Sequence, residues 1–118
     1  MTVPPQRLAD SARDHVRAQL RTLTGRALTE VRITRVHWPD GPRWVALALV
    51  NYRPYPSAPT RRHEVPLAEG GQHYDIALLL SQTFPDADWS LAQDYDVTAG
   101  VLRPHTVRLP ACLRGEQP

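Results

Sequence analysis

The chain has 118 residues, of which 42% are hydrophobic and 22% charged, and its formal net charge is +2. This length suits one domain with one core, and the composition excludes global disorder, collagen-like repeats and coiled coils. The uninterrupted apolar runs are too short for a signal-peptide core or a membrane span. We therefore expect one domain over residues 1–110, a flexible tail over 111–118 and a cytoplasmic location.

All 14 basic side chains are arginine, which indicates the codon bias of a high-GC bacterial genome and makes each single arginine less informative. Charge is unevenly distributed along the chain. Residues 1–62 carry eleven arginines and four acids, a net charge of +7, whereas residues 63–118 carry a net charge of −5. Such a contrast suits docking to a partner or head-to-tail self-association, although the two halves can also neutralise each other in the fold.

The first part of the chain contains a helical pattern followed by a strand pattern. Apolar residues recur at steps of three and four over 8–23, which predicts a helix, and Gly25 predicts its end. Residues 28–38 alternate between apolar and polar with one slip of phase. This predicts a strand with a bulge near Thr34 and Arg35.

The middle of the chain predicts two more strands. A turn at 39–42 is followed by residues 43–53, which are apolar on both faces and therefore predict a central strand of the sheet. Three prolines over 54–60 predict a loop. A third strand is expected over 61–67, and Pro66 predicts that it lies at an edge because proline cannot donate a ladder hydrogen bond.

The last part of the chain predicts a buried helix over 72–84, which Pro85 ends. Residues 89–98 alternate strictly and predict a strand with one face on the core. A last hairpin, or a continuation of this strand, is expected from residues 101–102 and 106–109. The whole pattern predicts an α+β domain with an antiparallel sheet of four or five strands and two helices on one face, in the order α-β-β-β-α-β with room for a further strand.

Arginine and aromatic residues interleave between Arg32 and Arg62, a composition that suits single-stranded nucleic acid. Guanidinium groups would follow the phosphates while aromatic rings stack on bases. Trp44 and Tyr52, however, share a face with small aliphatic residues, which favours packing under a helix. Binding of single-stranded nucleic acid by this surface stays as an alternative function.

Acidic and imidazole side chains form no recognisable catalytic or metal motif. Asp94 and Asp96 should lie on one face of a strand, where they could share Mg²⁺ with a third oxygen ligand, but no cation-binding loop accompanies them. The closest histidines, His63 and His73, are ten residues apart, so no zinc pair is present. We assign no catalytic, cofactor-binding or metal-binding residue, and a small enzyme with a His/Asp site is a further alternative.

The leading hypothesis is a non-enzymatic interaction module that binds a protein partner or associates with itself, for example as a homodimer, without contact to a membrane. It rests on the charge contrast between the halves and on the lack of a catalytic motif. The expected contact residues are an aromatic residue in the proline-containing loop, the arginines beside that loop and two acids of a later strand. These residues are Arg53, Tyr55, Arg61, Arg62, Asp94 and Asp96.

Overall fold

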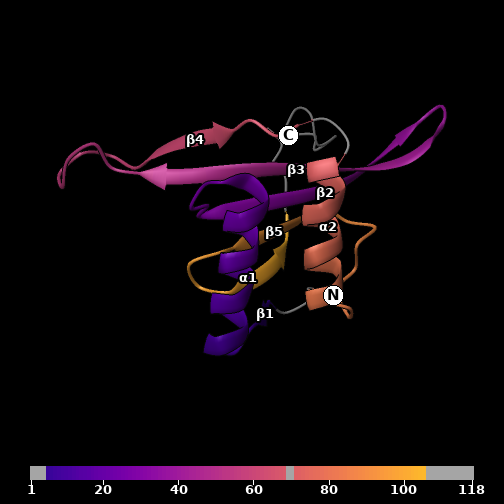
Figure 1. Cartoon of the computed structure of the whole chain (residues 1–118), viewed down its shortest axis with the longest axis horizontal. Coiled ribbons are helices and arrows are strands. Elements are labelled where there is room, and N and C mark those ends of the chain that lie inside the picture. Colours follow the sequence, from indigo (N-terminus) through magenta and orange to yellow (C-terminus); the bar gives the residue numbers. More distant parts are fainter. Residues whose placement is uncertain (1–4, 69–70, 106–118) are drawn as a thin grey trace, which may run out of the picture.

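The computed structural model describes residues 5–68 and 71–105, apart from the side chains of His37 and Trp38. These residues form two helices and a six-stranded antiparallel sheet with the strand order β1-β6-β5-β2-β3-β4 (Figure 1). The elements are β1 (Gln6–Arg7), α1 (Asp10–Thr24), β2 (Glu30–Trp38), β3 (Gly41–Tyr52), β4 (Arg61–Val65), α2 (Gly71–Thr83), β5 (Gln93–Asp96) and β6 (Val101–Pro104).

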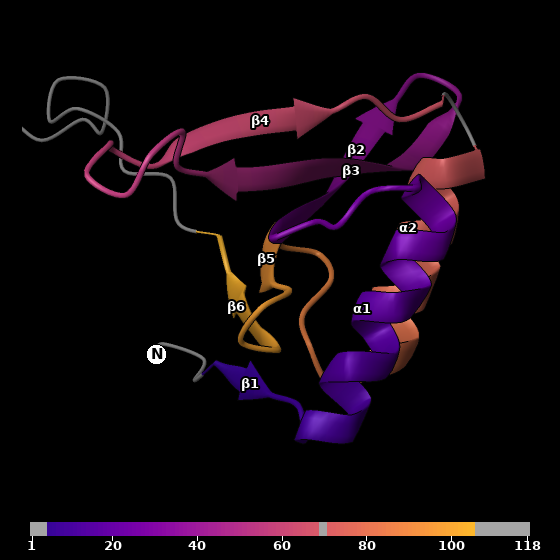
Figure 2. The ribbon, with the colours of Figure 1, turned by 60° about the vertical axis from the view of Figure 1, so that its left-hand side comes forward.

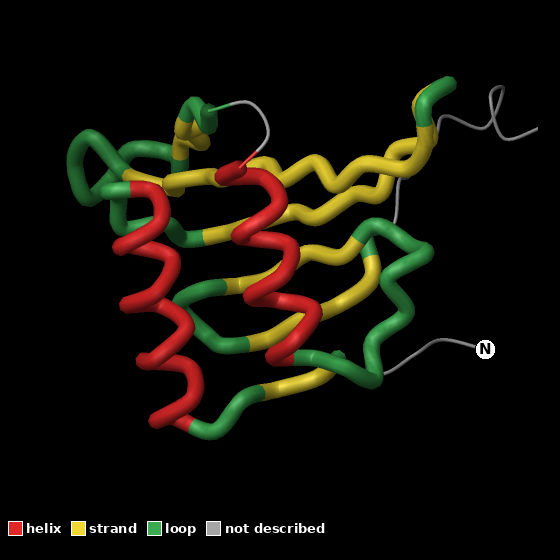
Figure 3. Tube along the Cα trace, turned by 45° about the vertical axis from the view of Figure 1, so that its right-hand side comes forward, coloured by secondary structure: helices red, strands yellow, loops and turns green. Residues whose placement is uncertain are grey.

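Both helices cover the same face of the sheet, as Figure 2 and Figure 3 show from two sides. In the described part of the chain no helix covers the other face, which we call the helix-free face. The predicted class, an α+β domain with an antiparallel sheet and two helices on one face, is confirmed. The predicted tail over 111–118 lies outside the described residues.

Helix α1 ends as predicted but begins later. Gly25 has a left-handed φ of 72°, and its N–H donates to the Arg21 carbonyl at 2.8 Å. The start lies at Asp10 because the preceding residues form β1, beyond which the Leu8 N–H donates to the Gly100 carbonyl at 2.8 Å. Strand β1 is two residues long, too short for a periodic pattern, and it raises the number of strands to six.

Strands β2 and β3 form a hairpin whose register pairs Glu30 with Leu49 and runs without interruption to the turn. The predicted bulge near Thr34 and Arg35 is therefore wrong. Strand β5 pairs with β2 only as far as Ile33. Beyond Ile33, β2 pairs only with β3, so the hairpin is a two-stranded ribbon there. The side chains of this ribbon do not have to alternate between a buried and an exposed face. The change of phase in the apolar pattern therefore does not require the extra residue of a bulge.

Strand β3 is an inner strand, as its two apolar faces predicted, but it lies next to the edge and not at the centre. Its second apolar face is explained by Leu47 and Leu49, which point to the helix-free side, and Leu49 is only 5% exposed there. Strand β4 is the edge strand that Pro66 predicted, and it ends at the preceding Val65.

Helix α2 agrees with its prediction within one residue at each end, whereas the strand that follows is shorter than predicted. Of residues 89–98, only Gln93–Asp96 pair with neighbouring strands. The predicted partner segment 106–109 lies outside the described residues, and β6 instead pairs with β5 in an antiparallel register.

Short-range hydrogen bonds fold the segment between α2 and β5. Trp89 Nε1–H donates to the Phe84 carbonyl at 3.0 Å. Asp88 Oδ1 accepts from the Ser90 hydroxyl and from the Ser90 N–H, and these two bonds lower the pKa of Asp88. Residues 89–92, which the alternating pattern assigned to the strand, therefore belong to this turn-containing segment, and β5 begins at Gln93.

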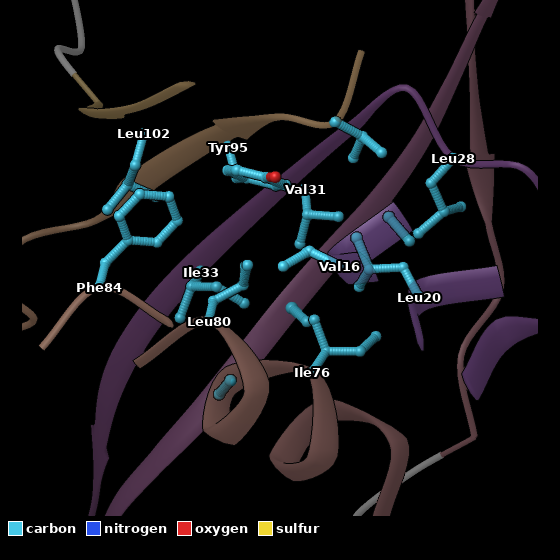
Figure 4. Packing of buried hydrophobic residues seen from close by; sticks show 14 of the residues in the cluster. Val16, Leu20, Leu28, Val31, Ile33, Ile76, Leu80, Phe84, Tyr95 and Leu102 are labelled. Atoms are coloured by element: carbon cyan, nitrogen blue, oxygen red, sulfur yellow. The ribbon is translucent and has the colours of Figure 1, made fainter. Parts of the chain in front are cut away.

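The core lies between the helices and the sheet (Figure 4). It contains buried side chains from both helices and five strands: Val16, Leu20, Leu28, Val31, Ile33, Ala46, Ala48, Val65, Ile76, Ala77, Leu80, Phe84, Tyr95, Val97 and Leu102. Tyr95 is 0% exposed, and its ring centroid lies 5.6 Å from that of Phe84. Its hydroxyl has no hydrogen-bond partner among the described residues, and burial raises its pKa to about 12.

Candidate functional site

The helix-free face is charged where β2 and β5 pair. Because β2 buries Ile33 in the core, strand alternation places Glu30 and Arg32 on the helix-free face. In the register of β2 with β5, Asp94 lies opposite Arg32 and Asp96 lies opposite Glu30. The sheet thus places one pair of opposite charges beside one pair of like charges.

Asp94 is held by two partners. Arg32 Nε donates to Asp94 Oδ1 at 2.8 Å, and His105 Nδ1 lies 2.7 Å from Asp94 Oδ2. The three side chains are between 20% and 24% exposed. Since both carboxylate oxygens are engaged in a partly buried position, the Asp94 side chain is fixed in orientation.

An arginine of strand β4 reduces the repulsion between the facing carboxylates of Glu30 and Asp96. Arg62 Nη2 of β4 donates to Glu30 Oε2 at 2.8 Å and so compensates one of the two facing carboxylates. Asp96 Oδ1 accepts the backbone N–H of Ala99 at 3.0 Å, a bond within the turn after β5. The Asp96 side chain lies at an exposed position.

A cleft of about 440 Å³ lies beside these groups, lined by Thr29, Glu30, Asn51, Asp94, Asp96, Thr98 and Arg103. Its lining combines three carboxylates with one guanidinium and with hydroxyl and amide groups. Asn51 Oδ1 is buried and accepts no hydrogen bond from a described residue. Of the three carboxylates, only Asp96 is exposed, and it offers an acceptor to a ligand group that donates hydrogen bonds or carries a positive charge.

The structure brings together three of the six predicted contact residues. Arg62, Asp94 and Asp96 lie on the helix-free face around the cleft or its ion pairs. The other three belong to the connection between β3 and β4 and the start of β4. There Arg53 Nε donates to Thr60 Oγ1 at 3.2 Å and Tyr55 is 59% exposed.

The other members of the cleft and its ion pairs were not among the six predicted contact residues, although Arg32 belongs to the predicted nucleic-acid-binding segment. These members are Thr29, Glu30, Arg32, Asn51, Thr98, Arg103 and His105. One available signal was the alternation in β2, which places Glu30 and Arg32 on the face opposite Ile33. The pairing of β2 with β5 was not readable, because the ion pair between Arg32 and Asp94 joins residues 62 positions apart.

The described residues contain no group of three or more His, Cys, Asp or Glu side chains placed to hold a metal ion. The Mg²⁺ hypothesis for Asp94 and Asp96 therefore gains no third ligand of these types. Other histidines have structural contacts. His73 Nδ1 accepts the backbone N–H of Ala46 at 3.0 Å, which joins α2 to β3.

The aromatic residues proposed to stack on bases are placed differently from one another. The ring of Trp44 meets that of Trp89 edge to face with centroids 6.3 Å apart, and the Arg35 guanidinium lies 5.7 Å from the Trp44 ring. Trp44 is thereby half-buried, while Tyr52 is 45% exposed. Stacking on bases at Trp44 would require these contacts to be given up.

Comparison with known proteins found no matching family model, no matching curated protein and no matching solved structure. Within residues 5–68 and 71–105, no helix is long and apolar enough to cross a membrane. The function is therefore argued from the geometry of the site.

Replacing Asp94 by asparagine should lower the free energy of unfolding by about 1 kcal/mol, because the Arg32 guanidinium loses its charged partner in a partly buried position. Urea unfolding of the Asp94→Asn variant measures this loss. Asp86→Asn, a change at an exposed carboxylate, is the matched control and should leave stability unchanged. Equal effects of the two substitutions would show that the Asp94 ion pairs contribute nothing.

Proposed function

We propose that this chain is a non-enzymatic, cytoplasmic interaction module that binds a protein partner on the helix-free face of its sheet. The observation that carries the proposal is the polar cleft, whose acceptors are held in place before any partner arrives. Arg32 and His105 fix Asp94, Arg62 holds Glu30, and the exposed Asp96 accepts the Ala99 N–H within its turn. Fixed polar groups reduce the ordering cost of binding and favour specific docking.

The chemistry of the cleft indicates which partner group it receives. Asp96 is exposed and has no cationic side-chain partner in the described part of the chain. An arginine or lysine side chain of the partner would supply both a positive charge and several N–H donors. We therefore propose a partner that inserts a basic side chain beside Asp96.

The test is affinity capture from lysate of the native host with quantitative mass spectrometry, using immobilised wild-type chain, Asp96→Arg and Asp86→Arg. Asp96→Arg reverses the charge at the cleft, whereas Asp86→Arg makes the same change at an exposed position outside it. We expect a protein that wild type and Asp86→Arg retain and that Asp96→Arg loses at least tenfold. Equal recovery on all three surfaces would contradict binding at the cleft.

A second candidate function, acid–base catalysis, is favoured by one contact. A carboxylate that holds Nδ1 of a histidine can orient the imidazole so that its other nitrogen transfers a proton, and Asp94 holds His105 in this way at 2.7 Å. The candidate predicts a hydrolytic or isomerising activity that His105→Ala abolishes and Asp86→Asn does not. Activity that survives His105→Ala would remove it.

The nucleic-acid alternative has its own measurement. An oligonucleotide should bind at low salt with an affinity that falls steeply as salt rises, and Arg61→Ala combined with Arg62→Ala should flatten this dependence. No binding at low salt would exclude this function.

A further inference from the structure

Strand β4 ends the sheet, and its outer edge pairs with no other described strand. Four of its five side chains are exposed, with Val65 as the buried exception. An edge of this kind presents a row of backbone N–H and C=O groups that a further strand can pair with.

The direction of the backbone groups in β4 follows from those in β3. In a strand, the N–H and C=O of one residue point to the same side, and successive residues alternate. The Leu49 carbonyl accepts the Thr29 N–H at 2.9 Å, and the Asn51 N–H donates to Thr29 Oγ1 at 2.7 Å. Leu49 and Asn51 therefore point their backbone groups toward β2, and Val50 between them points toward β4.

Val50 lies opposite His63 in the register of β3 with β4. His63 therefore forms its backbone hydrogen bonds with β3. Its neighbours Arg62 and Glu64 direct their N–H and C=O groups away from the sheet. Their side chains lie on the helix-free face, where Arg62 contacts Glu30.

We propose that a second copy of this chain adds its own β4 to this edge, antiparallel and with the two-fold axis at His63. In this register Arg62 lies opposite Glu64 of the second copy, and Glu64 lies opposite Arg62 of the second copy. Each of these pairs exchanges two backbone hydrogen bonds, so four bonds join the two sheets. Each pair also places opposite charges side by side on the helix-free face.

Charge selects this register over its neighbours. Shifting the two-fold axis to position 62 places Arg62 opposite itself, and shifting it to position 64 places Glu64 opposite itself, and like charges directly opposite are destabilising. An axis between two residues would pair outward-directed with inward-directed backbone groups, so it forms no regular ladder. The sequence of β4 is therefore complementary to itself in one register.

This inference rests on the proposed function only in treating the chain as an interaction module, because it uses the backbone edge of β4, and of its residues Arg62 alone also contacts a cleft group, Glu30. The first test is sedimentation velocity of the full chain up to about 1 mM, which detects weak association. We expect wild type to dimerise, and Arg62→Glu and Glu64→Arg each to be monomeric, with circular dichroism as the check on folding. An equimolar mixture of the two variants should dimerise again, since each chain then offers the complement of the other.

A cross-linking test keeps the proposal falsifiable if a charge variant fails to fold. At the axis, the two copies of position 63 form a non-hydrogen-bonded pair with Cα atoms about 4.5 Å apart, within the range of a disulfide. In a Cys112→Ser background, His63→Cys should give a cross-linked dimer on mild oxidation. Arg61→Cys, whose copies lie four residues apart in this register, should give none.

The outcomes separate this inference from the proposed function. Asp86→Arg should dimerise as wild type does, and so should Asp96→Arg, because Asp96 lies on β5, away from the edge. A monomeric wild type at about 1 mM, a mixture that stays monomeric, or equal cross-linking at positions 61 and 63 would each overturn the pairing of β4 strands. None of these results would affect capture of a partner at the cleft.

Discussion

Replacing Gly100 by alanine is expected to lower the free energy of unfolding by about 3 kcal/mol. Gly100 has a φ of 71°, a left-handed conformation that costs an L-residue about 1–2 kcal/mol. A Cβ at this position would also lie 2.8 Å from Arg13 Cγ and 3.0 Å from Arg13 Cβ, because the turn between β5 and β6 packs directly against α1. Urea unfolding measures the total.

Two controls separate strain from collision. Gly25 has a φ of 72° but no atom within 4 Å of an added Cβ, so Gly25→Ala should cost only about 1 kcal/mol. In an Arg13→Ala background, Gly100→Ala should lose part of its excess cost, because Cγ and Cδ are gone while the Cβ at 3.0 Å remains. If Gly100→Ala and Gly25→Ala cost the same, the close approach of α1 to this turn would be contradicted.

Raising the pH above 10 should destabilise the protein through Tyr95. Burial, assisted by the charge of Asp96, raises the pKa of Tyr95 to about 12 from 10.0, so the fold favours the neutral phenol. This contribution is complete below pH 10 and is lost as the pH rises from 10 to 12, since the unfolded chain ionises first. At pH 11 the loss should be about 1 kcal/mol, and it approaches about 3 kcal/mol above pH 12.

The Tyr95→Phe variant isolates this effect from the titration of other groups. Its free energy of unfolding should be higher than that of wild type by about 1–2 kcal/mol at pH 7, because the buried hydroxyl of Tyr95 has no partner among the described residues. Urea unfolding of both proteins at pH 8 and pH 11 gives the comparison. A difference between the two proteins that is the same at both pH values would show that Tyr95 ionises equally in the folded and unfolded states.

The parts of the fold that depend on local pattern were predictable. The apolar stripe of α1, the left-handed Gly25 at its end and the proline after β4 each act within a few residues. The predictions that failed depend on a distant partner strand in one case and on side-chain hydrogen bonds in the other, and neither is visible in apolar periodicity. Strand β1 exists only because β6 lies beside it, and β5 is shorter than its alternation predicted because Trp89 and Asp88 form local hydrogen bonds instead.

The candidate site was predictable only in the part that depends on local alternation. Alternation alone placed Asp94 and Asp96 on one face, and both line the cleft. Their partners come from β2 and from the end of β6, and only the strand order brings Glu30 and Arg32 opposite them. The spacing of residues in the sequence does not predict these contacts. They result from the pairing of β2 with β5, and the whole of α2 lies between these two strands in the chain.

The bond between His73 and β3 constrains the chemistry of the imidazole ring itself. To accept the Ala46 N–H, the ring needs a lone pair on Nδ1, so its hydrogen must reside on Nε2. The contact that joins helix to strand therefore selects one tautomer of this histidine.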